Sequence, residues 1–549
     1  MNFQLVAQNK ILVSKKWSDS ELRNWYHADS KFDSIPGISL NNWHKTNKRK
    51  QKSKQIIVAV IDTQIDINHE DLKGQIWTNK KEIANNNIDD DKNGFVDDIN
   101  GWNFLGTKSK NYTVWINYEY VRYVRKWMPL FNKKIENQLE PEYKVQFKEY
   151  QRALKKLNSE IEKYKDYVTR YTYTVEFFPK SKDTLKHFFP KEDYNYQQLD
   201  SLYKKYKIND KTYQQRRLDK DIDLGTKIDF MKIRFQYNQN EFEKVLDLKI
   251  QYDSILNKNL NLNYNDRLLI GDDEKVLNSK NGTNNISAKI NGIRAVQDHC
   301  TEVSGVIASN RENTIGIKGF SNSIKIMPLT ICGFGDENDK DIANAIRYAV
   351  DNGAKVINMS FGKEFSMHQD WVTDAFKYAE VHNVLLVHCS GNEQFDTDTN
   401  PYYPSDVAFD GTPEVCGNFI NVGSTSKNLN ENFVSSFSNY GKKNVDLFAP
   451  GEEIYITMPE NKYAFDSGTS LAGPMISGTA ALIWLYYPKL TVQQIKKIIL
   501  ESGTSFDIEV LVPGGNGKKA KFSELSKSGK LLNVYNAMQM AQKMSKSKK

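Results

Sequence analysis

A series of short, continuously apolar segments limits the folds open to this chain. They read IIVAVID, IKIMPLTI, AKVINMSFG, VLLVHCSGN and FINVGS, and each is bounded by polar residues or glycine. Strands buried on both faces of a parallel sheet have this composition. Between them lie helical patterns such as DIANAIRYAVDNGA, where Ile342, Ile346 and Ala349 share one face and Gly353 is placed to end the helix. The alternation predicts an α/β fold with a doubly wound, mainly parallel sheet.

A long segment of different composition interrupts this pattern. Residues 107–284 are rich in Lys, Tyr, Asn, Gln and Glu, and apolar side chains recur there at alternating gaps of four and three residues. The stripe comprises Tyr143, Phe147, Tyr150, Leu154, Leu157, Ile161, Tyr164, Val168 and Tyr171. A heptad stripe of this kind indicates a long helix, and a second helical pattern at residues 242–255 can pair with it.

We therefore predict three parts. Residues 1–54 form an N-terminal extension, residues 55–106 and 285–545 form a split α/β domain, and residues 107–284 form a helical, coiled-coil-like insertion. In the simpler interpretation the insertion packs on itself, and in the alternative it is a docking surface for a substrate or partner.

Composition narrows the classes of function. The 549 residues include 76 Lys and Arg against 68 Asp and Glu, and this mild net charge of +8 gives no indication of nucleic-acid binding. No apolar run reaches the length of a membrane span. The first residues, MNFQLVAQ, lack a basic leader but resemble the end of a secretory signal, so we expect a leader that is truncated or missing. Four scattered cysteines leave the redox compartment open.

Three distant segments each place one reactive residue at a strand end or a helix start. Asp62 ends an apolar strand, where open α/β sheets place their ligands. His299 begins the small-residue helix of DHCTEVSGVIA, and Ser470 lies in SGTSLAGP at the start of another helix. Each residue alone has an ordinary structural explanation as a turn, a packed histidine or a helix cap. Together they supply a carboxylate, a general base and a nucleophile, the set required for covalent acyl transfer.

These segments resemble the signatures of a known family. VAVIDTQID, DHCTEVSGVIA, VHCSGNE and SGTSLAGPMISG are similar, in content and order, to four signature segments of the subtilisin-like serine peptidases. The flanking NWYHADSKFDSIPGISL, NNIDDDKNGFVDDINGWNF and FSELSKSGKLLNVYNAMQMA resemble those of bacterial cell-envelope subtilases with long insertions. The resemblance implies a sheet of the subtilisin type, a serine endopeptidase acting on proteins or peptides, and a location outside the cytoplasm.

The resemblance also assigns catalytic roles. Asp62 would orient His299, and His299 would accept the proton of Ser470 as the serine oxygen attacks a peptide carbonyl. Asn392 in VHCSGNE matches the oxyanion asparagine of the family. Its side-chain amide would stabilise the developing negative charge together with the Ser470 N–H.

Substrate-binding residues follow from the same comparison. The segment NMSFGKE resembles the strand that lines the substrate cleft, so Ser360, Phe361 and Gly362 would pair with an extended peptide. Glu393 would lie near the rim of the first pocket.

The chain departs from the family beside the reacting groups. Gln64 replaces a glycine, and Cys300, Thr301 and Glu302 stand where the family has Gly-Thr-His after its histidine. An inward-facing Glu302 would raise the pKa of His299. Cys300 is expected to be an inert buried residue. The alternative to an enzyme is a catalytically silent subtilase scaffold that binds a partner through the insertion.

The acidic loop DDDKNGFVDD offers oxygen ligands at the first, third and fifth positions of an EF-hand-like calcium loop. The twelfth position is Asn100 rather than Glu, so the flanking helices of an EF-hand are not expected. Similar loops in the resembling subtilases bind calcium, so we favour a structural Ca²⁺ ion over a solvated acidic turn. The candidate ligands are Asp89, Asp91, Asn93, the Phe95 carbonyl, and Asp97 or Asp98.

Overall fold

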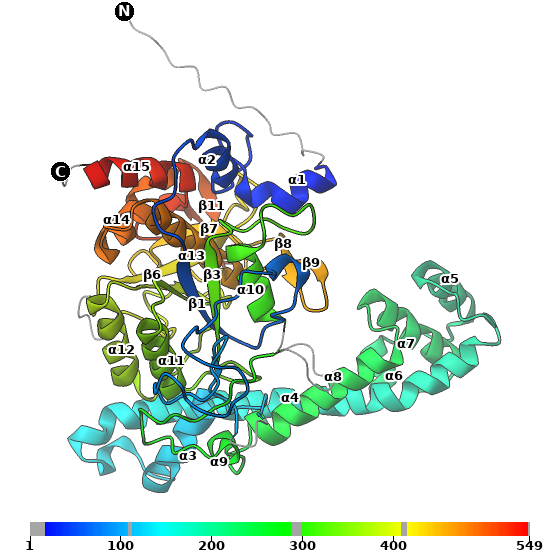
Figure 1. Ribbon diagram of the computed structural model, residues 1–549. Coiled ribbons are helices and arrows are strands. Elements are labelled where there is room, and N and C mark those ends of the chain that lie inside the picture. The colour runs from blue at the N-terminus through cyan, green and yellow to red at the C-terminus, as the bar shows by residue number, and fades with distance from the viewer. Residues whose placement is uncertain (1–16, 108–111, 288–297, 408–413, 547–549) are drawn as a thin grey trace, which may run out of the picture. The chain divides into compact units, whose positions relative to one another are not determined.

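The computed structural model describes residues 17–107, 112–287, 298–407 and 414–546. It divides into two compact units, of which Trp115–Asp266 is one and the segments before and after it are the other. The larger unit is built on a nine-stranded sheet with the order β10-β13-β7-β6-β5-β4-β1-β3-β2. Strands β1, β3, β6 and β7 of this sheet are labelled in Figure 1. The strands are β1 (Ile56–Asp62), β2 (Trp102–Asn103), β3 (Ile324–Thr330), β4 (Val356–Met359), β5 (Leu385–Cys389), β6 (Phe419–Thr425), β7 (Leu447–Pro450), β10 (Thr504–Ser505) and β13 (Lys530–Leu531).

The sheet is mainly parallel. Strands β1 to β7 pair in parallel, and only the short β10 runs antiparallel to its neighbour β13 at the edge. The apolar segments singled out in the sequence coincide with the strands β1, β3, β4, β5 and β6, the last of which extends one residue further, to Thr425. The prediction of a mainly parallel sheet is therefore confirmed.

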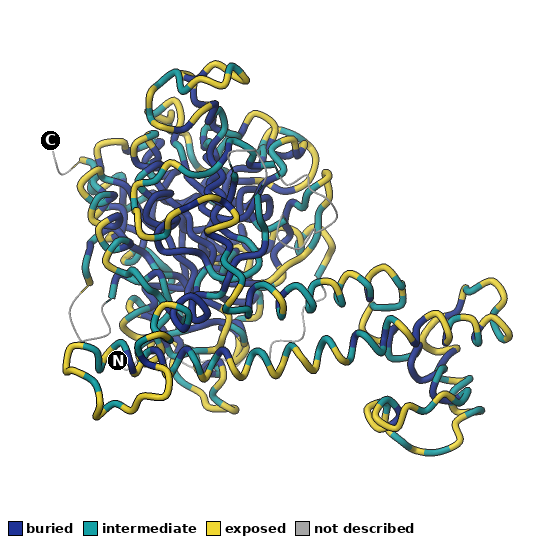
Figure 2. The backbone as a smooth tube through the Cα atoms, turned by 90° about the horizontal axis from the view of Figure 1, so that it is seen from below, coloured by how far each residue is buried: buried dark blue, intermediate teal, exposed yellow. Residues whose placement is uncertain are grey.

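Side chains of β1 alternate between two apolar cores, so helices cover both faces of the sheet. Val58 and Val60 point into a core shared with α10 (His299–Ala308) and α13 (Thr469–Tyr486). Ala59 and Ile61 point into a second core with α11 (Asp339–Asp351) and α12 (Gln369–Val381). This is the doubly wound arrangement predicted from the sequence. In Figure 2 the interior of the molecule is dark blue, the colour of buried residues.

Further elements complete the core that contains α13. Helices α14 (Val492–Ser502) and α15 (Val534–Lys546) pack there. A two-stranded hairpin, β8 (Ile454–Met458) and β9 (Lys462–Asp466), precedes α13, and a second one pairs β11 (Glu509–Leu511) with β12 (Lys519–Lys521).

The described part of the N-terminal segment belongs to the same core. It contains α1 (Asp19–Asn24), a 3-10 turn and α2 (Leu40–Thr46). Trp25, Tyr26 and Trp43 are buried there, and the Tyr26 hydroxyl donates a hydrogen bond of 3.1 Å to the carbonyl of Tyr455. These residues therefore extend the α/β unit instead of forming a separate body.

The second unit is helical, as predicted for the insertion. Its helices are α3 (Glu119–Phe131), α4 (Lys144–Leu185), α5 (Tyr196–Tyr206), α6 (Tyr213–Leu218), α7 (Leu224–Gln236) and α8 (Phe242–Ser254). Helix α4 has 42 residues, so it is about 63 Å long. The rings of Tyr164, Tyr167 and Tyr171 surround Tyr252 of α8 at centroid distances of 5.0 to 6.0 Å, so the two predicted helical patterns pack on each other.

Within the described ranges, no helix combines the length and the apolar character needed to cross a membrane.

Candidate active site

The carboxyl end of β1 brings Asp62 against the first residue of α10. His299 Nδ1 lies 2.8 Å from Asp62 Oδ1 and 3.0 Å from Oδ2. The carboxylate is 1% exposed and also accepts the N–H of Thr63 at 2.7 Å. The Thr63 hydroxyl in turn accepts the N–H of Cys300, which fixes the start of α10 against β1. With Nδ1 donating to Asp62, the Nε2 atom of His299 is the nitrogen that can accept a proton.

Ser470 is the second residue of α13. Its hydroxyl, its backbone N–H and the side-chain amide of Asn392 all lie near Gly468. A Cβ placed on Gly468 would lie 2.8 Å from Ser470 Oγ, 3.6 Å from Asn392 Nδ2 and 3.7 Å from Ser470 N. The Oδ1 atom of Asn392 accepts the N–H and the hydroxyl of Thr469, at 2.9 and 3.0 Å, so Nδ2 is turned toward this space. Two donors and one hydroxyl oxygen thus lie beside Gly468, on the side where that residue carries no side chain. Donors placed next to a hydroxyl in this way suit an oxyanion beside an attacked carbonyl.

A proline early in α13 leaves one helix carbonyl without its usual hydrogen-bond donor, and a residue just after β4 donates to it instead. Pro474 has no N–H, so the Ser470 carbonyl lacks its ordinary helical donor. Instead it accepts the Ser360 hydroxyl at 2.8 Å. Ser360 accepts the side-chain amide of Asn358 at 2.9 Å, and Asn358 accepts the Ser477 hydroxyl at 2.8 Å. The chain of hydrogen bonds ties the end of β4 to the helix that carries Ser470, a role for Ser360 that the sequence analysis missed.

Acidic side chains surround His299. Burial by itself lowers the pKa of His299, but the charge and hydrogen bond of Asp62, followed by the charges of Glu302 and Asp466, raise it to about 9. Glu302 is 6% exposed, and burial raises the pKa of its carboxyl to about 7. Glu302 therefore faces inward and acts on His299 in the direction expected from the sequence.

The other departures from the family are also buried. Gln64 is 3% exposed and packs beside the Tyr112 hydroxyl. Cys300 is fully buried, and burial raises the pKa of its thiol well above the ordinary value. This disfavours the thiolate, the reactive form of cysteine. Cys332, Cys389 and Cys416 are likewise buried free thiols.

The predicted substrate-binding residues follow the ends of two adjacent strands. Ser360, Phe361 and Gly362 continue from β4, and the Phe361 carbonyl accepts a hydrogen bond from His388 Nε2 at 2.8 Å. Glu393 follows β5, and its carboxylate accepts the side-chain amide of Asn439 at 2.8 Å. These residues follow the carboxyl ends of the strands. Ser360 is hydrogen-bonded there to the carbonyl of Ser470, at the start of α13.

The acidic loop forms a separate candidate site with one unexpected member. Ligand atoms of Asp89, Asp91 and Glu82 lie within 4.8 Å of one another. Glu82 lies upstream of the loop motif, so the spacing gave no signal for it. Asp89 also accepts the N–H groups of Asn93 and Gly94, and Gly94 has a φ of +95°, which favours glycine.

The remaining predicted ligands make other contacts. The Asp97 carboxylate accepts the N–H groups of Asn86 and Asn87, both at 3.1 Å, and so stabilises a turn. The Asp98 carboxylate accepts hydrogen bonds from the side chains of Asn79, Asn93 and Tyr348. Phe95 is buried, with its ring against Trp102 and Tyr348.

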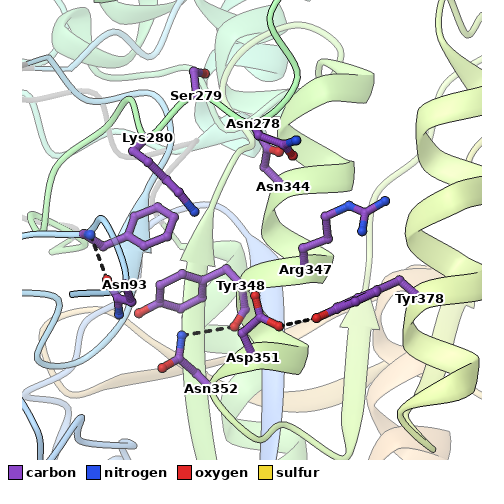
Figure 3. A pocket seen from close by; sticks show the side chains of 11 residues that line it. Asn93, Asn278, Ser279, Lys280, Asn344, Arg347, Tyr348, Asp351, Asn352 and Tyr378 are labelled. Atoms are coloured by element: carbon purple, nitrogen blue, oxygen red, sulfur yellow. Dashed lines mark hydrogen bonds between the residues drawn. The ribbon is translucent and has the colours of Figure 1, made fainter. Parts of the chain in front are cut away.

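A pocket of about 200 Å³ borders this loop (Figure 3). Asn93 and Phe95 line it together with Lys280, whose ammonium lies 4.4 Å from the centroid of the Phe95 ring. The Tyr378 hydroxyl donates to Asp351 at 2.6 Å at the opposite wall. Its lining includes none of the residues around Ser470, so the pocket is distinct from the candidate active site.

The order Asp62, His299, Ser470 along the chain, on a mainly parallel sheet, is that of subtilisin-type serine hydrolases. The sequence profile of the subtilase family matches residues 53–524, and the chain belongs to this family.

Individual relatives match shorter parts of the chain. The thermophilic serine proteinase of Bacillus sp. (strain AK1) is 34% identical over 189 residues, which are 34% of this chain and 43% of the relative. The cell wall-associated protease of Bacillus subtilis (strain 168) is 31% identical over 220 residues, 40% of this chain and 22% of the relative. The matches thus span less than half of both relatives. A crystal structure of a cold-adapted subtilisin-like serine proteinase is 24% identical and covers 43% of this chain and 74% of that one, with a TM-score of 0.34.

Proposed function

We propose that the protein is a serine endopeptidase that hydrolyses peptide bonds through an acyl-enzyme. The observation that carries this proposal is that two pairs of groups lie on elements of one core, with His299 on α10 and Ser470 on α13. His299 is hydrogen-bonded to a buried carboxylate, and Ser470 Oγ and Asn392 Nδ2 both lie beside Gly468. This pairing supplies a base and a nucleophile with an oxyanion donor beside it.

The reaction follows from these contacts. Asp62 accepts the Nδ1 hydrogen of His299, which keeps the Nε2 lone pair available as a base. Ser470 Oγ attacks the peptide carbonyl and gives its proton to Nε2, while the carbonyl electron pair moves to the oxygen. Asn392 Nδ2 and the Ser470 N–H stabilise this oxyanion. Collapse expels the amine, which takes the proton from His299, and water then hydrolyses the acyl-enzyme by the same steps.

The basicity of His299 sets the working pH. A pKa of about 9 means that the imidazole is mostly protonated at neutral pH and becomes a competent base as the pH rises. We therefore expect an enzyme of alkaline preference.

A structural calcium ion belongs to the same proposal. Carboxylate oxygens are the ligands that Ca²⁺ prefers, and ligand atoms of Glu82, Asp89 and Asp91 lie within 4.8 Å of one another. Bound calcium would neutralise their mutual repulsion and hold the acidic loop in place. These three residues, rather than the full set expected from the loop motif, are the best supported protein ligands.

We place the enzyme outside the cytoplasm, in the cell envelope or secreted. The support is family membership and the similarity to a cell wall-associated protease. The helical unit Trp115–Asp266 is proposed as the part that docks a substrate or partner protein.

A cleavage-site profile on a complex proteome tests the proposal. The wild-type protein with calcium should generate new peptide termini, and Ser470→Ala should generate none while keeping the same thermal unfolding temperature. A folded wild-type protein that cleaves no protein would overturn the proposal. It would favour the silent scaffold, whose partner should be lost when residues 115–266 are removed.

A further inference from the structure

Two chain segments leave adjacent strands and run beside Ser470. Residues 360–362 follow β4, and the Ser360 hydroxyl donates to the Ser470 carbonyl at 2.8 Å. Residues 390–392 follow β5, and the Gly391 N–H donates to the hydroxyl of Thr469 at 3.1 Å. A carbonyl carbon attacked by Ser470 is bonded directly to the Cα of the residue before the scissile bond. The space bordered by these two segments is therefore within reach of the side chain of that residue.

The ring of Tyr402 occupies this space. A Cβ placed on Gly362 would lie 2.3 Å from Cε1 of Tyr402, and a Cβ on Gly391 would lie 2.6 Å from its Cζ. Both distances are too short for any side chain, so each glycine is in direct contact with the ring. Gly362 makes room for an aromatic side chain that belongs to the protein itself, whereas Gly391, with a φ of +101°, lies against this ring and against the side chains of Glu393 and Asn439.

Backbone and side-chain hydrogen bonds hold the ring in position. Lys363 and Tyr403 exchange two backbone hydrogen bonds of 2.9 and 2.8 Å, which fix Tyr402 alongside Gly362. The Tyr402 hydroxyl donates to Glu393 Oε1 at 3.3 Å, and the other oxygen of Glu393 accepts the amide of Asn439.

Asn439, the residue that holds Glu393, is itself fixed by hydrogen bonds to the backbone. The Oδ1 atom of Asn439 accepts the N–H groups of Glu393 and Phe395, at 3.0 and 2.8 Å. The hydrogen bond to Glu393 thus adds to the backbone pairing and the glycine contacts that position the ring, and Glu393 is itself held by Asn439. The carboxylate expected at the pocket rim therefore serves to hold the ring.

We propose that Tyr402 is a specificity-determining residue that fills the pocket for the side chain preceding the scissile bond. The preferred substrates are then peptides with glycine or alanine at that position, and large or aromatic side chains are excluded. This inference rests on the proposed peptidase function and adds its substrate class.

The test uses pairs of peptides that differ only in alanine or phenylalanine before the scissile bond. The ratio of kcat/KM for the alanine peptide to that for the phenylalanine peptide is measured for the full chain. Wild type should favour alanine by about 10²-fold or more, a typical discrimination by pocket shape. Tyr402→Gly should lower this ratio by about 10²-fold because it opens the pocket. Tyr402→Phe should keep the alanine preference because the ring remains.

The outcomes separate this inference from the proposed function. Wild type that cleaves both peptides equally well would overturn the inference even if Tyr402→Gly failed to fold. An unchanged ratio in a folded Tyr402→Gly protein would also overturn it. Labelling of Ser470 by a fluorophosphonate is measured on the same samples. Cleavage with labelling but without the alanine preference refutes only the role of Tyr402, whereas a folded wild type with neither refutes the peptidase and this inference together.

Discussion

Replacing Glu302 with glutamine should lower the pH at which activity rises. Histidine accepts the Ser470 proton only in its neutral form, so kcat/KM should increase through the His299 pKa of about 9. The Glu302 carboxyl has a pKa of about 7, so it is ionised where His299 titrates and stabilises the imidazolium. Removing this negative charge favours neutral imidazole, and the rising limb of the pH profile moves to lower pH.

The magnitude follows from the helix geometry. Side chains three residues apart on a helix have Cβ atoms about 5–6 Å apart. Two unit charges about 6 Å apart, at an effective dielectric constant of about 20, interact by about 3 kcal/mol, or about 2 pKa units. The His299 side chain is 29% exposed, so solvent weakens the interaction, and we expect a shift of about 1 to 2 units.

The assay is the pH profile of kcat/KM on an uncharged peptide for wild type, Glu302→Gln and Glu312→Gln. The control, Glu312→Gln, removes the same charge from an exposed position beyond the carboxyl end of α10. Helix α10 has 10 residues and is therefore about 15 Å long, so Glu312 lies far from His299. Charges at that distance are screened in ordinary salt, so the control profile should match wild type. A Glu302→Gln midpoint that stays in place or moves to higher pH would refute the reasoning.

Three further predictions address the other contacts. Ser360→Ala leaves the Ser470 carbonyl without its hydrogen-bond donor, and an unpaired buried carbonyl raises the free energy of this arrangement by about 1–3 kcal/mol. We therefore expect kcat to fall more than KM changes, and an unchanged kcat would contradict this. Asn392→Ala should lower kcat about 10²- to 10³-fold, the loss known for an oxyanion donor in subtilisin, with a normal thermal unfolding temperature; full activity would exclude the role. Chelation of calcium should lower the unfolding temperature of wild type and of Glu312→Gln, but have less effect on Glu82→Gln; equal responses in all three proteins would argue against the site.

Much of the sheet and the order of the reacting residues could be predicted from the sequence. Central strands of a parallel sheet are buried on both faces, so their apolar runs stand out, and residues just after such runs reach the same sheet edge. This logic placed Asp62 at the end of β1, where it meets His299 at 2.8 Å.

Contacts between side chains on elements that are distant in the sequence could not be predicted in this way. Glu82 joins the acidic loop from outside its motif, and the hydroxyl of Ser360 meets a carbonyl left unpaired by a proline on another element. Tyr402 lies between two glycines that follow different strands. Pro474 alone gave a signal that could have been used, because a proline inside a helix always leaves one carbonyl in need of a donor.

The most direct test of the central claim is to locate the adduct formed by a fluorophosphonate on the folded, calcium-loaded protein. The account predicts one adduct on Ser470, mapped by mass spectrometry of proteolytic peptides. It should be absent in Ser470→Ala and form much more slowly in His299→Ala, because the base no longer activates the serine. Folded protein that remains unlabelled, or that is labelled at another residue, would contradict the assignment of Ser470 as the nucleophile.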